Sequence, residues 1–312
     1  MDLYLAPMEE VTGYVFRNVS AKFFGGVDKY FTPFITPSQK RILKTRDGRE
    51  INPEHNSGLN VVPQILTKDT VGFGELAAYL GTLGYRELNI NLGCPSNTVA
   101  GKGKGSGMLR NPADVRKFLD GVFDGPDTVF REFPDMKISV KTRLGYDSDT
   151  DFDELLEVYN DFPISELVIH PRIQKDFYKG ALRMDVLRAY ADKVKAPLCY
   201  NGDITDVSSF ERISGEFTSL DSVMIGRGAV ANPAIFREIR TGRKADTKEM
   251  TEFIKALFEE YSSEFGPSDA VFKMKEVWSY FHVNFPDSER ELRKIQKAKS
   301  PADYLDAVRF LG

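Results

Sequence analysis

The sequence is poor in the residues that build metal sites and disulfide frameworks. Its 312 residues include two cysteines, three histidines and one tryptophan. Two cysteines cannot cross-link a small secreted domain, and His55, His170 and His282 do not have the spacing of a zinc site. We therefore expect no metal, and a reducing, cytoplasmic environment.

Long apolar runs and an excess of basic charge are also missing. No apolar run approaches the roughly 20 residues that cross a membrane, and the first expected strand begins at residue 3, which leaves no room for a signal peptide. The net charge of −4 does not indicate a nucleic-acid-binding protein, although it is compatible with a local basic patch. We expect a globular protein with no membrane contact, most simply a monomer.

Short apolar stretches, most of them followed by a turn and a helical pattern, occur eight times before residue 240. They span residues 3–7, 29–35, 61–66, 87–93, 138–144, 166–172, 197–202 and 222–228. Near-continuous apolar strands that alternate with helices indicate a parallel sheet covered on both faces. The pattern predicts an α/β fold, a (β/α)8 TIM barrel over residues 1–241, since such barrels typically take about 250 residues.

The pattern changes after Arg240, where the strand candidates end. Helical periods occupy residues 250–265, 270–285, 288–299 and 301–311. We expect residues 247–312 to form a small C-terminal all-α helical domain, with Trp278, Tyr280 and Phe281 in its core.

Polar side chains recur where the predicted strands end. The active site of a (β/α)8 barrel lies at the carboxyl ends of its strands, and buried polar groups cost free energy unless they are paired. The strand ends therefore predict a single site. In chain order they provide Ala6-Pro7-Met8, Gln64, Asn91 with Cys94, Lys141 with Arg143, His170 with Arg172, Asn201-Gly202-Asp203 and Gly226-Arg227-Gly228.

The fourth strand end is the most unusual of these. A turn at Gly93 and Cys94 leads into the glycine-rich loop 101–107, which also contains Lys102 and Lys104. A lone cysteine is most often a small buried residue, but one in a turn at a strand end is a candidate for chemistry. We expect the cationic loop to close over a polyanionic substrate.

Glycines near the last two strands suggest a phosphate site. The loops after strands seven and eight of such barrels often bind phosphate through backbone N–H groups. Gly202, Gly226 and Gly228 would permit a close approach, and Arg227 adds positive charge. The same glycines could equally serve only to make tight turns.

Two further stretches are basic. The long polar connection 34–60 includes Lys40, Arg41, Lys44, Arg46 and Arg49, and we interpret part of it as a flap on the catalytic face. In the tail, one helix face collects Arg290, Arg293, Lys294 and Lys297. Such a stripe suits contacts with RNA phosphates, although a charge run is more often only a solvated face.

Five short sequence motifs at the strand ends resemble those of the flavin-dependent tRNA dihydrouridine synthases. They are Leu5-Ala6-Pro7-Met8, Asn91-Leu92-Gly93-Cys94-Pro95-Ser96, Val140-Lys141-Thr142-Arg143-Leu144-Gly145, Asn201-Gly202-Asp203-Ile204 and Met224-Ile225-Gly226-Arg227-Gly228. The resemblance covers essentially the whole chain, including the helical tail. The Gly-Cys-Pro-Ser segment and the glycines after it look most like the bacterial C-type branch.

The resemblance implies FMN as cofactor, NADPH or NADH as reductant, and reduction of the 5,6 double bond of a D-loop uridine in tRNA, with tRNA position 16 as the expected target. Cys94 would donate the proton, and Lys141 would stabilise negative charge on the reduced flavin. Cofactor contacts are implied for Ala6, Pro7, Met8, Gln64, Lys141, His170, Asn201, Gly202, Asp203, Gly226 and Arg227. Taken with the basic stretches, the resemblance also implies tRNA contacts for Asn91, Lys102, Lys104, Arg172, Arg290, Arg293, Lys294 and Lys297.

The chain departs from the usual pattern of the family at one motif. The family usually has His-Gly-Arg-Thr after strand six, whereas this chain has Pro171 and Ile173, so a contact through that amide N–H or threonine hydroxyl is lost.

Three alternative functions stay open. The first is an FMN-dependent barrel dehydrogenase acting on a small pyrimidine-like substrate, which would not need the basic tail. The others are an aldolase-type lyase that uses Lys141 without flavin, and a non-catalytic RNA-binding barrel, against which Cys94 and Lys141 together argue.

Overall fold

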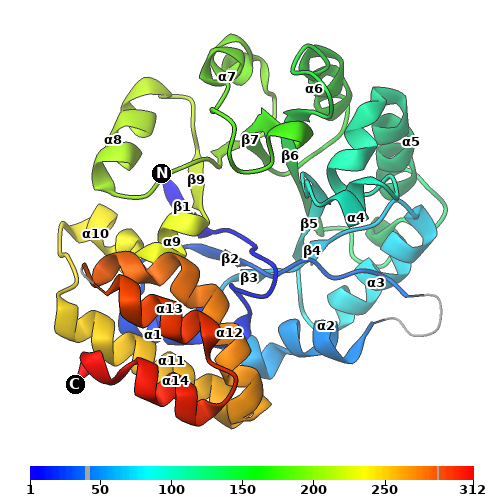
Figure 1. Cartoon of the computed structure of the whole chain (residues 1–312). Coiled ribbons are helices and arrows are strands. Elements are labelled where there is room, and N and C mark those ends of the chain that lie inside the picture. Colours follow the sequence, from blue (N-terminus) through cyan, green and yellow to red (C-terminus); the bar gives the residue numbers. More distant parts are fainter. Residues whose placement is uncertain (39–42, 287) are drawn as a thin grey trace.

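The computed structural model describes residues 1–38, 43–286 and 288–312. Within these residues, nine parallel strands in the order β3-β2-β1-β9-β8-β7-β6-β5-β4 form a nearly closed barrel with helices around it (Figure 1). The strands are β1 (Asp2–Leu5), β2 (Lys29–Phe31), β3 (Val61–Val62), β4 (Gln64–Ile65), β5 (Glu87–Leu92), β6 (Lys137–Gly145), β7 (Leu167–Ile173), β8 (Leu198–Tyr200) and β9 (Ser222–Ile225). The predicted (β/α)8 barrel is confirmed, because every predicted strand overlaps one or two of these.

The barrel closes around Pro63, which divides the predicted third strand into two short pieces. Proline has no N–H group to donate to a neighbouring strand. β3 therefore pairs only with β2, and β4 pairs with β5. The Pro63 carbonyl still accepts a hydrogen bond from the Asn89 N–H at 2.9 Å, which keeps β5 next to the junction where Gln64 lies.

The last strand is shorter than predicted. β9 ends at Ile225, and Gly226 is the N-cap of α9 (Arg227–Ala231). Arg227 and Gly228 therefore begin a helix instead of ending a strand. A Cβ on Gly228 would lie 2.0 Å from the Ile204 carbonyl oxygen, so glycine is needed for α9 to pack against the loop after β8.

The helices around the barrel begin where the sequence provides caps. α5 follows Asn111, whose side chain accepts the Ala113 N–H at 3.2 Å, and α8 follows Asp206, which accepts the Ser209 N–H at 2.7 Å. The barrel helices are α1 (Tyr14–Phe23), α2 (Thr45–Glu50), α3 (Thr70–Thr82), α4 (Asn97–Ala100), α5 (Pro112–Phe123), α6 (Phe152–Asn160), α7 (Met184–Tyr190), α8 (Val207–Glu216), α9 and α10 (Ile235–Thr241). No helix in the described part of the chain is long and apolar enough to span a membrane.

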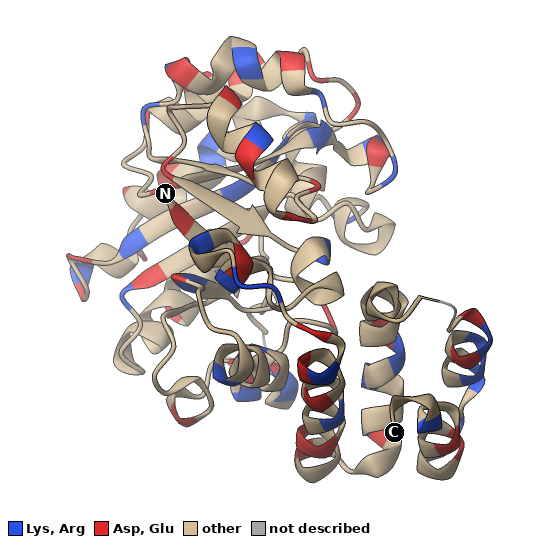
Figure 2. Cartoon of the chain, turned by 90° about the vertical axis from the view of Figure 1, so that its left-hand side faces the viewer, with Lys and Arg blue, Asp and Glu red and all other residues tan. Residues whose placement is uncertain are grey.

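The tail is entirely helical in its described residues. It consists of α11 (Thr247–Phe265), α12 (Pro267–Phe281), α13 (Glu289–Lys297) and α14 (Pro301–Ala307), with short 3-10 turns after α12 and α14. Trp278 is buried and donates its indole N–H to the Tyr304 hydroxyl at 3.0 Å. Phe253 of α11 packs against Phe16 and Phe24 of the α1 region, with ring centroids 6.1 and 5.3 Å apart. The apolar core thus continues from the barrel into the tail, which projects from one side of the molecule (Figures 1 and 2).

Candidate active site

The polar strand ends open into one cavity of about 940 Å³, a typical size for a ligand site. Of the residues predicted from the sequence, it is lined by Ala6, Pro7, Met8, Gln64, Asn91, Cys94, Lys141, His170, Asn201, Gly202, Asp203, Gly226 and Arg227. The tail overhangs the cavity with Glu276, Ser279 and Tyr280 of α12, so Tyr280 is a wall residue as well as part of the tail. Arg172 and the basic residues of the glycine-rich loop and α13 lie outside the lining.

Cys94 lies in the first turn after β5, and Asn91 holds that turn. The Asn91 side-chain oxygen accepts hydrogen bonds from the backbone N–H groups of Gly93 at 3.1 Å and Cys94 at 2.9 Å. On the other side, the Cys94 carbonyl accepts the Ser106 hydroxyl at 2.7 Å and the Ser106 N–H at 3.2 Å. Burial raises the pKa of the partly exposed Cys94 thiol, so the thiol keeps its proton at neutral pH.

The glycine-rich loop packs directly against the Cys94 turn. A Cβ on Gly105 would lie 3.1 Å from the Cys94 Cβ, and Gly105 has a φ of +55°. A Cβ on Gly107 would lie 2.2 Å from the Ala100 carbonyl oxygen. These two glycines therefore allow close backbone contact beside the thiol, and Lys102 lies on the exposed part of the loop.

Lys141 and His170 face the cavity from the neighbouring strands β6 and β7. Burial, followed by the charge of Arg143, lowers the pKa of Lys141 to about 8. Burial and the surrounding cations lower the pKa of His170 well below 6.5, so this imidazole is neutral. His170 Nε2 lies 3.0 Å from Nη1 of Arg172, which can only donate, so the imidazole proton is on Nδ1.

Asp203 arranges the charges at the end of the cavity near β8 and β9. Its carboxylate accepts hydrogen bonds from Arg172 at 2.5 and 3.0 Å and also pairs with Arg227. Burial opposes ionisation, but the two arginines outweigh it and keep the pKa of Asp203 below its usual value. Arg172 is buried and also donates to the Gly180 carbonyl at 2.6 Å, so it lies beneath the loop after β7. Two guanidinium groups against one carboxylate leave a surplus positive charge.

Tyr178 is a cavity residue that sequence reasoning missed. Its ring lies 5.3 Å from the Arg143 guanidinium and 5.5 Å from that of Arg227, and it stacks on His170 with centroids 6.2 Å apart. It lies in the loop after β7, where no motif or periodicity marks it. Only the expectation that loops at this end of a barrel form the site could have drawn attention to it.

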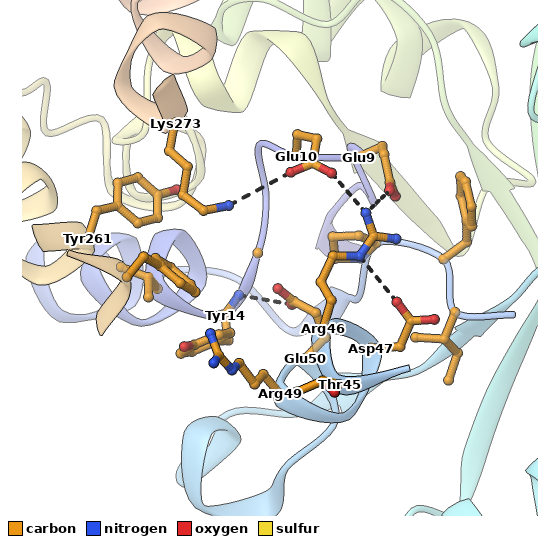
Figure 3. Close-up of a pocket in the computed structure, with 16 residues that line it drawn as sticks. Glu9, Glu10, Tyr14, Thr45, Arg46, Asp47, Arg49, Glu50, Tyr261 and Lys273 are labelled. Atoms are coloured by element: carbon orange, nitrogen blue, oxygen red, sulfur yellow. Dashed lines mark hydrogen bonds and ion pairs between the residues drawn. The ribbon is translucent and has the colours of Figure 1, made fainter. Parts of the chain in front are cut away.

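A second, smaller pocket of about 320 Å³ adjoins the cavity and shares Glu9 and Phe34 with it. Figure 3 shows α2 on one side of this pocket and the tail residues Tyr261 and Lys273 on the other. Arg46 of α2 pairs with Glu9 and Glu10, each at 2.8 Å, and with Asp47 at 3.2 Å. The ion pairs attach α2 to the chain that follows β1.

These contacts change the interpretation of the basic flap. Glu50 of α2 accepts hydrogen bonds from the Tyr14 N–H and from Arg17, each at 3.0 Å, so α2 also caps the start of α1. Arg49 lies over the Phe265 ring at 5.8 Å. Much of the predicted positive charge is thus already partnered within the protein. Lys40 and Arg41 lie outside the described residues.

Two surfaces near the cavity keep a local excess of positive charge. Lys68 lies against the glycine-rich loop, since a Cβ on Gly103 would lie 3.5 Å from its Nζ. Burial and the charges of Lys102, Lys68 and Lys44 lower the pKa of Lys104, while Asp69 opposes them. This lysine cluster consists of Lys44, Lys68, Lys102 and Lys104. Lys68 was not predicted, because 34 residues separate it from Lys102 and only the fold brings them together. None of the four has an ion-pair partner among the residues that the structure describes.

The second positive surface is the predicted stripe on α13. Its exposed side chains are Arg290, Arg293, Lys294 and Lys297. Ile295 on the opposite face is buried, and Gln296 donates to the Lys275 carbonyl of α12 at 3.0 Å. The stripe is therefore held beside the helix that overhangs the cavity.

A parallel barrel whose strand ends gather a thiol, a lysine and a histidine in one cavity defines a (β/α)8-barrel enzyme. No group of three His, Cys, Asp or Glu side chains is placed to hold a metal ion in the parts of the chain that are described. The dihydrouridine synthase (Dus) family profile matches residues 4–309. The chain therefore belongs to the dihydrouridine synthase family.

Relatives in several bacteria align with most of this chain and over most of their own length. "Probable tRNA-dihydrouridine synthase 2" of Bacillus subtilis is 32% identical over 275 residues, which is 83% of this chain and 79% of that protein. "tRNA-dihydrouridine(16) synthase" of Pseudomonas syringae pv. tomato is 29% identical over 252 residues, 79% of this chain and 77% of that protein. "tRNA-dihydrouridine synthase B" of Shewanella oneidensis is 28% identical over 262 residues, which is 82% of this chain and 78% of that protein. Because these identities are so close, the C-type branch stays a prediction.

Two solved structures have a similar barrel fold. Morphinone reductase superposes with a TM-score of 0.55 at 10% identity, over 77% of this chain and 86% of that one. The old yellow enzyme homologue from Zymomonas mobilis has a TM-score of 0.55 at 12% identity, over 78% of this chain and 89% of that one. At these identities the similarity establishes the barrel fold alone.

Proposed function

We propose that this chain is a flavin-dependent tRNA-dihydrouridine synthase, which reduces the 5,6 double bond of a D-loop uridine with FMN in the cavity and NADPH or NADH as reductant. One observation carries the proposal beyond family membership. A protonated thiol, Cys94, and a lysine of lowered pKa, Lys141, line the same cavity at the carboxyl ends of adjacent strands. Reduction of an activated double bond needs a proton source and positive charge beside the developing negative charge.

The residues present fit a flavin mononucleotide. A Cβ on Gly226 would lie 3.3 Å from the Ala6 Cβ and 3.5 Å from the Met8 Sδ, so this stretch of wall is flat only because position 226 is glycine. The first N–H groups of α9 have no helical partner, and Arg227 adds charge beside them, which suits a phosphate. Gln64 on β4 and Lys141 on β6 supply polar contacts farther round the barrel, and His170 lies beside Arg172. When bound, FMN would supply the hydride.

In this proposal Cys94 supplies the proton to carbon 5 of the uracil. Burial keeps the thiol protonated at neutral pH, so it can donate its proton without first taking one up from another group. The hydrogen bonds of Asn91 and Ser106 to the Cys94 backbone restrain the direction in which the thiol can point. An ionised Lys141 stabilises negative charge that develops in the cavity, and its lowered pKa makes that contribution depend on pH near neutrality.

The two positive surfaces support RNA as the substrate. The lysine cluster lies beside the Cys94 turn, and the α13 stripe lies beside α12, so cations border the cavity on the barrel and on the tail. Both would contact phosphates. The exposed side chains of Tyr178 on the barrel and Val283 after α12 also line the cavity, where an unstacked base could pack. A small pyrimidine would use neither charged surface.

Several finer expectations belong to the same proposal. They are reduction at tRNA position 16, membership of the C-type branch, tRNA contacts by the predicted basic residues, action as a monomer in the cytoplasm, and a helical domain at 247–312 that orients the tRNA. Comparison of unmodified tRNA with free uridine nucleotide as oxidant of the NADPH-reduced protein tests the central part. Reoxidation of the flavin by tRNA alone supports the proposal, and reoxidation by the free nucleotide at an equal rate supports the small-molecule dehydrogenase instead.

A further inference from the structure

A continuous line of hydrogen bonds runs through the barrel wall beneath the cavity, across the neighbouring strands β4, β5 and β6 (Figure 1). Asn89 Nδ2 donates to the Ser139 hydroxyl at 2.9 Å, and Gln64 Nε2 donates to Asn89 Oδ1 at 2.7 Å. Asn91 Nδ2 then donates to Gln64 Oε1 at 2.7 Å. All four side chains are at most 7% exposed, so water does not replace these bonds.

Backbone groups at its two ends fix the direction of this chain of hydrogen bonds. At one end Ser139 Oγ donates to the Leu88 carbonyl at 3.2 Å, which can only accept. At the other end Asn91 Oδ1 accepts the N–H groups of Gly93 and Cys94, which can only donate. In every amide between these ends the oxygen therefore lies on the side toward Cys94 and the nitrogen on the side toward Ser139. No amide can rotate by 180° without losing its hydrogen bonds on both sides.

The fixed direction determines what this wall offers to a ligand. The oxygen of Asn91 is fully used, and the oxygen of Gln64 already accepts one bond. Each amide nitrogen makes one hydrogen bond within the described residues and keeps one N–H group. Gln64 and Asn91 both line the cavity, so they present N–H donors to acceptor atoms of whatever binds there.

We propose that Ser139 and Asn89 are positioning residues that hold Gln64 and Asn91 as hydrogen-bond donors and thereby fix both the ligand-binding edge and the Cys94 turn. The inference rests on the proposed flavin-dependent function for the identity of the ligand. Neither residue reaches the cavity, since both are fully buried and neither is among its lining residues. Removal of the Ser139 hydroxyl would leave the buried Asn89 Nδ2 without its acceptor, which weakens the restraint on Asn89 and, through it, on Gln64.

Ser139→Ala tests the proposal, with Thr142→Val as the matched control. Thr142 is on the same strand and equally buried, and its hydroxyl bonds with the Arg143 carbonyl at 3.0 Å and the Tyr159 hydroxyl at 2.9 Å, outside the line from Ser139 to Asn91. For Ser139→Ala we expect FMN affinity to fall about tenfold, the visible spectrum of the bound flavin to shift, and the alkylation rate of Cys94 in the flavin-free protein to change at least threefold. Thr142→Val should match the wild type in all three, and Ser139→Thr should restore them.

Asn89→Asp provides a second test that keeps the shape of the side chain. In this fully buried position the carboxyl group is expected to keep its proton, so its O–H donates to Ser139 and its other oxygen accepts from Gln64, and the proposal predicts FMN affinity within about twofold of the wild type. A loss as large as that of Ser139→Ala would overturn the proposal. The proposal is also overturned if Ser139→Ala behaves like Thr142→Val. Because Cys94 alkylation needs neither flavin nor RNA, failure of the proposed enzymatic function would leave that readout intact.

Discussion

Asp203 binds Arg172 through both carboxylate oxygens, at 2.5 and 3.0 Å, and it does so from a backbone in the left-handed region, with a φ of +39°. Asparagine tolerates this backbone region, so Asp203→Asn removes the charge without adding backbone strain. The variant should lose about 2 kcal/mol of unfolding free energy at pH 7, because the buried Arg172 would keep its charge without an anionic partner. Urea unfolding measures the loss, and Asp185→Asn, at an exposed ion pair, should have almost no effect.

The pair of Asp203 and Arg172 also makes the free energy of unfolding depend on pH in a defined direction. The pKa of Asp203 is lower in the folded protein than in the unfolded chain. Its contribution is therefore present above the unfolded pKa of about 4 and is lost as the pH falls through the folded-state pKa. The difference in stability between the wild type and Asp203→Asn should shrink as the pH is lowered from about 4 to below the folded-state pKa. A difference that stays constant over this range would show that the charge of Asp203 does not stabilise the fold.

Lys141 predicts that stability rises with pH as well, but at alkaline pH and because burial penalises its charged form. Burial lowers the pKa of Lys141 to about 8, so between that pH and about 10.5 the unfolded chain binds a proton that the folded protein does not. Stability contributed at this site therefore rises with pH over that interval. The flavin-free wild type should gain stability relative to Lys141→Met as the pH is raised from 8 to 10, measured by urea unfolding of both proteins. A parallel pH profile for the two proteins would place the Lys141 pKa near its ordinary value.

Cys94→Ala separates the two halves of the proposed reaction. The thiol is a proton source and not part of the cavity end that suits the phosphate, so flavin content and the rate of flavin reduction by NADPH should stay within about twofold of the wild type. Reoxidation by tRNA should slow by about 100-fold or more, the usual contribution of a general acid. Stopped-flow absorbance resolves both steps. Unchanged reoxidation by tRNA would remove the proton-donor role from Cys94.

The α13 stripe predicts a salt-dependent contribution to RNA binding. Replacement of Arg290, Arg293 and Lys294 by glutamine should weaken tRNA binding and reduce the slope of log Kd against log salt by about 2, if each cation meets one phosphate. Lys244→Gln together with Lys248→Gln is a control of similar chemistry at the start of the tail, away from α13. Equal effects in the two sets would show that α13 contributes only general charge.

The sequence predicted the barrel and most of the cavity because strand ends are a local signal. The thiol turn, Lys141 and His170 could be assigned to one site as soon as eight parallel strands were inferred, since such strands deliver their carboxyl ends to one face. The break at Pro63 and the early end of β9 at Ile225 were missed in detail, because pairing depends on neighbours in the sheet. Periodicity alone does not fix those neighbours.

Other features depend on contacts between distant parts of the chain. The cluster around Lys68 and the hydrogen bonds from Ser139 to Asn89 join residues from separate strands and loops. The cations of α2 were predicted to belong to a basic flap on the catalytic face, yet Arg46 pairs with acids that precede α1. Charge composition reports how many cations a segment has, and only the fold determines which of them already have partners.

The most direct test of the central claim is the mass of tRNA nucleosides after reaction. Unmodified tRNA is incubated with the FMN-loaded protein and NADPH, digested, and analysed by mass spectrometry with fragments mapped to the D-loop. The proposal predicts one D-loop uridine heavier by the mass of two hydrogen atoms, formed by the wild type and largely absent with Cys94→Ala. A flavin-loaded, NADPH-reducible protein that leaves every uridine unchanged would contradict it.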